Sequence, residues 1–245
     1  MGDVGFDAIL FDLDDTLIDW WGSISRCLGD IADDRVVDAL LGYCRRELWL
    51  DAPGGDYVWH RNTWALHHRR QTIWPEVLDW LDHAELELLM KRFDDELWVG
   101  FYPETVPTLD GLVDSTRLAV LSNNHLIDDE AERLRLGDWF ELATAPPREL
   151  AKPNPEAFLT VCRQLGVEPG RTVYVGDSIK SDVLGALGAG LIPVWHDRWD
   201  DPWPDPPVGA HRVATLAELP AVLEAVSRPG PDGSPPNVGW TNVGR

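Results

Sequence analysis

Short apolar runs that alternate with segments of helical spacing predict an α/β fold, in which helices cover both faces of a parallel β-sheet. Three such runs, at residues 8–11, 118–121 and 173–175, end in polar side chains, as is typical of strands buried in a parallel sheet. Residues 19–102 have a different sequence pattern, in which apolar positions recur at helical spacing. The sequence therefore predicts a sheet domain into which a helical domain is inserted.

The inserted region is predicted to hold four or five helices. Apolar spacing indicates helices over 35–48, around 77–81 and over 84–98. Breaks are expected at 53–55, which reads Pro-Gly-Gly, and at Pro75, a residue that can occupy the first turn of a helix.

Beyond the insert, strands and helices alternate again. Further strands are predicted at 142–144, 191–195 and 212–215. Further helices are predicted at 108–113, 155–166, 181–187 and 219–226, and Gly166 is expected to end the second of them. The predicted organisation is a sheet domain of residues 1–18 and 103–227, a helical domain of residues 19–102 and a disordered C-terminal tail of residues 228–245.

Composition narrows the classes of function. Hydrophobic residues make up 44% of the 245 residues, which is typical of a globular protein. A net charge of −21 argues against nucleic acid and anionic membranes as partners, and it requires any anion site to supply its own positive charge. Three scattered cysteines and an N-terminus without a basic segment followed by an apolar one lead us to expect a cytoplasmic protein. Its expected oligomeric state is a monomer or a homodimer.

Carboxylates crowd the end of the first predicted strand. Asp12, Asp14 and Asp15 lie within four residues directly after Phe11. Carboxylates packed this closely repel one another, and a divalent cation with a preference for hard oxygen ligands, such as Mg²⁺, would relieve the repulsion. Taken alone, the loop is equally compatible with a solvated acidic turn.

Polar side chains also follow the other predicted strands. Ser122 and Asn123 follow the second apolar run, Asp177 follows the third, and Lys152 precedes a predicted helix. Because ligands of open α/β sheets bind outside the carboxyl ends of the strands, these groups are expected to meet at one edge of the sheet.

These stretches occur in a characteristic order: Asp12-Leu-Asp14-Asp-Thr16, then an apolar run with Ser122-Asn123, then Lys152-Pro, then Gly-Asp177 with Asp182 five residues on. In this order they resemble the motifs of the haloacid dehalogenase (HAD) superfamily of hydrolases. The resemblance covers about residues 6–18 and 103–226. It implies a Rossmann-like sheet core (the HAD fold), a helical cap of the C1 type formed by the insert, and Mg²⁺ as cofactor.

The resemblance also implies residue roles for catalysis. Asp12 would be the nucleophile that forms an aspartyl-phosphate, Asp14 the general acid and base, and Lys152 the cation beside Asp12. Mg²⁺ would bind Asp12, Asp177 and the main-chain carbonyl of Asp14. Asp15 occupies a position where many members have glycine, and it is assigned no catalytic role.

The remaining motif positions have supporting roles in this interpretation. Ser122 and Asn123 would hydrogen-bond the transferring phosphoryl group. Thr16 would hold the acidic loop through its hydroxyl, and Asp182 would brace Lys152 or a metal-bound water. Lys180 could reach a phosphate, although a solvated surface position fits it as well.

Together, these expectations favour a Mg²⁺-dependent phosphatase of a small phosphorylated metabolite. A phosphomutase of the same superfamily would use the same site. A 2-haloacid dehalogenase is less compatible, because those enzymes commonly carry tyrosine where this chain has Asp14. A non-catalytic binding module with the same fold is the alternative from another class, and the complete set of motif residues argues against it.

Overall fold

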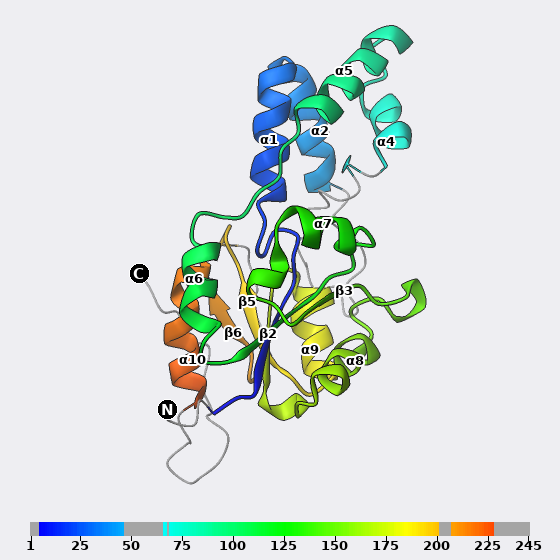
Figure 1. Cartoon of the computed structure of the whole chain (residues 1–245). Coiled ribbons are helices and arrows are strands. Elements are labelled where there is room, and N and C mark those ends of the chain that lie inside the picture. Colours follow the sequence, from blue (N-terminus) through cyan, green and yellow to red (C-terminus); the bar gives the residue numbers. More distant parts are fainter. Residues whose placement is uncertain (1–4, 47–65, 68, 201–206, 228–245) are drawn as a thin grey trace. The chain divides into compact units, whose positions relative to one another are not determined.

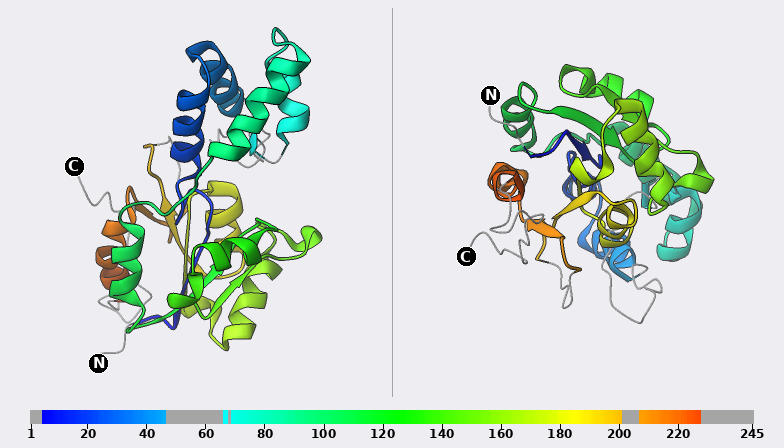
Figure 2. Two further views of the ribbon diagram at one scale, coloured as in Figure 1. Left: turned by 45° about the horizontal axis from the view of Figure 1, so that its top comes forward. Right: turned by 90° about the horizontal axis from the view of Figure 1, so that it is seen from below.

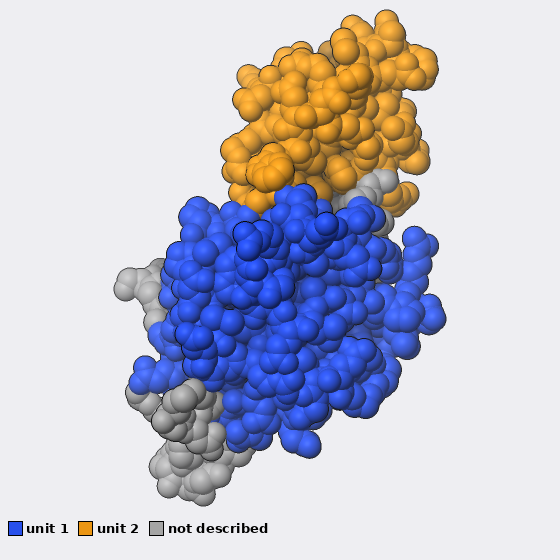
Figure 3. All heavy atoms as spheres, in the orientation of Figure 1, with its two compact units in different colours: residues 1–18, 101–245 blue, residues 19–100 orange. Residues whose placement is uncertain are grey.

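The computed structural model describes residues 5–46, 66–67, 69–200 and 207–227. The chain divides into two compact units, a sheet unit of Met1–Ile18 and Phe101–Arg245 and a helical unit of Asp19–Gly100, shown in separate colours in Figure 3. The predicted break in the insert at 53–55 and the predicted tail at 228–245 lie outside the described residues.

Six parallel strands form one sheet in the order β3-β2-β1-β4-β5-β6. Their bounds are β1 Ala8–Phe11, β2 Arg117–Leu121, β3 Leu142–Thr144, β4 Thr172–Gly176, β5 Ile192–His196 and β6 His211–Val213. Every residue of the two central strands β1 and β4 is buried, which explains why both read as continuous apolar runs. The predicted parallel α/β architecture is confirmed.

Helices cover both faces of this sheet (Figures 1 and 2). Their bounds are α6 Thr105–Leu112, α7 Ile127–Arg133, α8 Pro155–Leu165, α9 Gly185–Gly188 and α10 Leu219–Ser227. Apolar side chains of α8 and α9 pack with Ala8 and Leu10 on one face, and α6 and α10 lie on the opposite face (Figure 2). As predicted, α8 ends at Gly166, whose φ of 68° is in the left-handed region.

Helix α7 was not predicted from the sequence. Its seven residues read IDDEAER, and Ile127 is its one buried residue. A helix with a single buried apolar position has no stripe of apolar residues, so helical periodicity cannot reveal it.

In the helical unit the described helices are α1 Trp20–Ile31, α2 Asp34–Arg46, α4 Arg70–Val77 and α5 His83–Glu96. The expectation that Pro75 marks the first turn of a helix is wrong, because Pro75 lies inside α4, near its C-terminal end. Proline lacks the N–H that would bond one turn back, so Pro75 removes one main-chain bond of this helix, which ends two residues later at Val77. Residues 78–81 accordingly form a turn rather than the predicted helix.

Tryptophan side chains contribute to packing in both units. Trp74 is fully buried in the helical unit, where it meets Phe93 edge to face at 5.0 Å and donates its indole N–H to the Leu66 main-chain oxygen at 3.1 Å. Trp98 differs, since it is 72% exposed. No helix within the described ranges combines the length and the apolar character that crossing a membrane requires.

Candidate active site

The carboxyl ends of the central strands are level with one another. Phe11 at the end of β1 pairs with Val120 of β2 and with Val175 of β4. The next residue, Asp12, donates its main-chain N–H to the Val175 oxygen at 2.8 Å. This register brings the polar residues that follow β1, β2 and β4 to one edge of the sheet.

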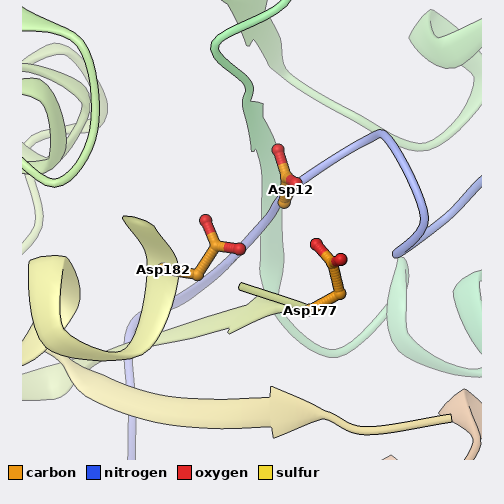
Figure 4. Close-up of side chains that lie close together, drawn as sticks. All are labelled: Asp12, Asp177 and Asp182. Carbon is orange, nitrogen blue, oxygen red and sulfur yellow. The ribbon is translucent and has the colours of Figure 1, made fainter. Parts of the chain in front are cut away.

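Three carboxylates gather at this edge. Asp12, Asp177 and Asp182 each offer an oxygen, and these oxygens lie within 4.8 Å of one another. Figure 4 shows the three side chains close together. Asp12 follows β1 and Asp177 follows β4. Asp182 comes from the wide helical turn Ile179–Leu184, in which the Val183 N–H bonds to the Ser178 oxygen five residues back at 3.2 Å.

The local electrostatics are unfavourable for three charged carboxylates. Burial raises the pKa of the Asp12 carboxyl to about 6, against the opposing attraction of Lys152. Burial and the negative charges of Asp182, Asp12 and Asp15 hold the pKa of Asp177 well above its usual range, although its side chain keeps some solvent exposure. Hard oxygen donors with surplus negative charge are the ligand set that a divalent cation such as Mg²⁺ requires, so these residues fit one.

Lys152 is the cation buried within this cluster. Its ammonium donates hydrogen bonds to Asp12 Oδ1 at 2.8 Å, to Asp182 Oδ1 at 2.7 Å and to the Tyr174 hydroxyl at 2.6 Å. The two carboxylates raise the pKa of Lys152 even though burial alone would lower it, so the side chain stays charged. The sequence-based expectations that Lys152 stands beside Asp12 and that Asp182 braces Lys152 agree with this geometry.

Asp14 contacts the loop that follows β2. Its Oδ1 accepts a hydrogen bond from the Asn124 side-chain amide at 3.4 Å, and the Asn124 main-chain N–H bonds to the Ser122 hydroxyl oxygen at 3.2 Å. Ser122 is buried. The loop after β2 thus connects two of the predicted site residues through Asn124, a residue that the sequence analysis did not select.

Asn123 uses its side chain differently from the sequence-based expectation. Its amide N–H donates to the Lys152 main-chain oxygen at 3.0 Å, and its Oδ1 accepts from the Lys152 main-chain N–H at 2.9 Å. This reciprocal pair fixes the loop that carries Lys152. The expected contact of Asn123 with a phosphoryl group stays a prediction.

The expectation that the Thr16 hydroxyl holds the acidic loop is not met. Its Oγ1 is buried and has no hydrogen-bond partner among the described residues. The loop is instead closed by main-chain bonds to the Leu13 oxygen, from the N–H groups of Leu17 at 2.9 Å and Ile18 at 3.1 Å. Lys180, the ambiguous lysine, is exposed.

Two backbone positions in the site depend on residue type. Asp15 has a φ of 55°, in the left-handed region that glycine and, less readily, aspartate and asparagine adopt. At Gly176 a Cβ atom would lie 2.4 Å from Cγ of Asp182. Only glycine at position 176 lets Asp182 approach the end of β4 this closely.

Tyr174 also belongs to the site and was missed as a functional residue. It occupies the middle of the apolar strand β4, where its spacing indicated only a core position. A buried tyrosine hydroxyl needs a hydrogen-bond partner, and this requirement could have marked Tyr174 as more than a core residue. The sequence could not identify the partner, because Lys152 is distant along the chain.

Comparisons with known proteins find relatives that cover most of this chain. The family model described as haloacid dehalogenase-like hydrolase matches residues 6–190. Human N-acylneuraminate-9-phosphatase is 40% identical over 238 residues, which cover 89% of this chain and 94% of the relative. A pyrimidine 5'-nucleotidase of Escherichia coli is 26% identical over 226 residues, which cover 89% of this chain and 98% of the relative.

Solved structures include similar proteins of two activities. A 2-haloacid dehalogenase from Pseudomonas syringae has a TM-score of 0.55 at 26% identity, covering 89% of this chain and 98% of the other. A HAD phosphatase from Thermococcus onnurineus has a TM-score of 0.54 at 27% identity, covering 89% of this chain and 97% of the other. The likeness in overall structure is therefore common to a dehalogenase and a phosphatase.

Proposed function

This chain belongs to the haloacid dehalogenase-like hydrolase family, and from that premise we propose that it is a Mg²⁺-dependent phosphatase of a small phosphorylated metabolite. In this proposal the phosphoryl group passes through a covalent intermediate on Asp12. The observation that carries the proposal is the bond between Lys152 and one oxygen of the Asp12 carboxylate, Oδ1, at 2.8 Å. The charge on Lys152 offsets part of the repulsion between Asp12 and an approaching phosphate ester.

The proposed reaction has two displacements at phosphorus. In the first, Asp12 attacks the phosphorus atom, the bond to the ester oxygen breaks, and Asp14 gives its proton to that oxygen. In the second, Asp14 takes a proton from a water molecule, the water attacks the same phosphorus atom, and the bond to Asp12 breaks. One residue can serve as acid and then as base because the second step returns the proton that the first step used.

Asp12, Asp177 and the main-chain carbonyl of Asp14 would hold the Mg²⁺ ion. When bound, it would neutralise negative charge on the carboxylates and on the phosphoryl oxygens. Asp182 is the least available member of the acidic cluster, because its Oδ1 binds Lys152 at 2.7 Å and its Oδ2 accepts from the Ser178 main-chain N–H at 2.9 Å. Its proposed role is therefore to position Lys152.

Asp14 supports a phosphatase over a dehalogenase. A carboxyl group at this position can supply the proton that an alkoxide leaving group needs, whereas a halide ion leaves without one. The relatives named as phosphatase and nucleotidase cover most of this chain, which supports phosphate esters as substrates. A phosphomutase would use the same first displacement, and only its product would differ.

The helical unit of Asp19–Gly100 is proposed to be the cap that excludes water and selects the substrate. We also propose a cytoplasmic location, because the described cysteines, Cys27 and Cys162, are buried free thiols. Nucleic acids are not proposed as partners, since the net charge is −21.

The test is phosphate release from a panel of phosphate monoesters, with and without Mg²⁺. The panel includes N-acylneuraminate 9-phosphate, pyrimidine nucleoside 5'-monophosphates, other sugar phosphates and p-nitrophenyl phosphate. We expect Mg²⁺-dependent turnover that Asp12→Asn abolishes. Conversion of a sugar phosphate to its isomer without net phosphate release would instead indicate a mutase, and chloride release from a chloroacid without Mg²⁺ would indicate a dehalogenase.

A further inference from the structure

The ammonium group of Lys152 has a hydrogen-bond acceptor for each of its three N–H groups. Two acceptors are the carboxylate oxygens of Asp12 and Asp182, and the third is the Tyr174 hydroxyl, at 2.6 Å. All three contacts are buried. An ammonium group has no further donors, so Lys152 can bind a substrate oxygen only by giving up one of these partners.

Tyr174 links this ammonium group to the main chain of the neighbouring strand. Its hydroxyl oxygen accepts from Lys152, and its single proton has the Leu121 main-chain oxygen as the nearer acceptor, at 2.9 Å, compared with Asp182 Oδ1 at 3.2 Å. Leu121 ends β2 and directly precedes Ser122. The hydroxyl therefore connects the cation beside Asp12 to the strand that carries the Ser122 loop.

The chemical character of the hydroxyl suits this role. Burial and the charge of Asp182 hold the pKa of Tyr174 well above its usual range, so the side chain remains neutral. A neutral acceptor satisfies the third N–H without adding a fourth negative group to a cluster that already holds three carboxylates. The ring is fixed by Phe158, which it meets edge to face at 4.8 Å.

We propose that Tyr174 is a positioning residue, whose hydroxyl holds the Lys152 ammonium in the orientation that keeps it bonded to Asp12. Its consequence for turnover rests on the phosphatase activity proposed above. Without the hydroxyl, one N–H of Lys152 would be left unsatisfied in a buried site, and the ammonium would no longer be fixed in this orientation. We expect the affinity for substrate to change little, because Lys152 keeps its positive charge in the variant.

The matched pair of variants is Tyr174→Phe and Tyr102→Phe. Both remove one buried hydroxyl from the sheet unit and keep the ring. Tyr102 packs against His196 and Arg198, with the Arg198 guanidinium 3.8 Å from its ring centroid. For Tyr174→Phe we expect kcat to fall about tenfold or more with KM within about twofold, because a lost hydrogen bond to a charged group is worth about this factor. For Tyr102→Phe we expect kcat within about twofold of wild type.

A second measurement does not depend on enzyme activity. The chain has three lysines, Lys91, Lys152 and Lys180, and only Lys152 is buried, since Lys91 and Lys180 are exposed. In ¹⁵N-lysine NMR of the metal-free full chain, we expect one slowly exchanging ammonium signal, assigned by its loss in Lys152→Met. We expect hydrogen exchange of this signal to become at least about tenfold faster in Tyr174→Phe and to stay unchanged in Tyr102→Phe.

Unchanged exchange of the Lys152 ammonium in a folded Tyr174→Phe protein would overturn the proposal, as would an increase in KM with kcat preserved. The NMR measurement needs no substrate. If wild-type protein hydrolyses no phosphate ester but Tyr174→Phe still accelerates the exchange, the proposed phosphatase activity fails while the positioning of Lys152 by Tyr174 stands.

Discussion

Replacement of Asp177 by asparagine should stabilise the metal-free protein. The variant keeps the size and shape of the side chain and removes one negative charge from a cluster whose oxygens lie within 4.8 Å of one another. Because the pKa of Asp177 is raised in the folded protein, its carboxylate opposes folding wherever the unfolded chain would have it ionised.

The expected size follows from the geometry. Two unit charges 4.8 Å apart repel by about 3 kcal/mol at an effective dielectric constant of about 20. Asp177 meets two such neighbours, Asp12 and Asp182, and the charge of Lys152 offsets part of the sum. We therefore expect Asp177→Asn to raise the free energy of unfolding by about 2 kcal/mol at about pH 8 without metal, which corresponds to a rise in Tm of roughly 4 to 8 °C.

The pH dependence has a definite sign. A carboxyl group with a raised pKa binds more protons in the folded than in the unfolded state, so its unfavourable contribution grows as pH rises above the unfolded pKa, about 4. The advantage of Asp177→Asn should therefore be present at about pH 8 and should disappear as the pH approaches about 4. In excess Mg²⁺ the wild-type protein should be more stable than Asp177→Asn, because the ion stabilises the wild-type site more strongly than that of the variant.

The assay is thermal and urea unfolding of both proteins in a chelator and in excess Mg²⁺. The control is Asp114→Asn, which makes the same change in net charge at an exposed position of the sheet unit and should leave stability within about 0.5 kcal/mol of wild type. Equal or lower stability of Asp177→Asn in chelator at about pH 8 would refute the electrostatic reasoning.

Three further predictions concern other residues of the candidate active site. Lys152→Met should lower kcat by about a thousandfold, which a phosphate-release assay measures. In chelator it should also lower the free energy of unfolding in urea by about 3 kcal/mol, because it leaves buried carboxylates without their cation. Turnover of the variant at the wild-type rate would contradict the role of Lys152. Asp14→Asn should keep substrate binding and lower kcat by about 10²- to 10⁴-fold, and a loss confined to KM would exclude Asp14 as the acid and base. Gly176→Ala places a Cβ atom 2.4 Å from Cγ of Asp182 and should destabilise the protein by about 2 kcal/mol; urea unfolding beside Gly137→Ala, where a Cβ meets nothing within 4 Å, checks this.

The sheet was predictable because its central strands are buried along their whole length. Their sequences therefore read as uninterrupted apolar runs, and β1 was predicted at Ala8–Phe11, the bounds that the structure has. Helix α7 was not predictable in this way, since Ile127 is its one buried residue. Pro75 was misplaced because α4 buries Ile73 and Trp74, and this packing outweighs the preference of proline for the first turn of a helix.

For the site, the sequence indicated which strand ends bear the candidate catalytic residues, but it did not predict all of the hydrogen bonds between them. Asp12, Lys152 and Asp182 were selected by motif and meet in the structure. Tyr174 and Asn124 act through partners distant along the chain, Lys152 and Asp14, so no local pattern identifies them. The side-chain bonds of Asn123 to the main chain of Lys152 were hidden for the same reason.

The covalent intermediate on Asp12 is the central claim, and trapping it is the most direct test. Wild-type protein is mixed with a substrate found in the phosphatase panel, quenched in acid during the first turnover, and digested for mass spectrometry. The account predicts one added phosphoryl group on the peptide that contains Asp12 and none in Asp12→Asn. Turnover by wild-type protein with no phosphorylated peptide at any quench time, together with phosphate release by Asp12→Asn at the wild-type rate, would contradict it.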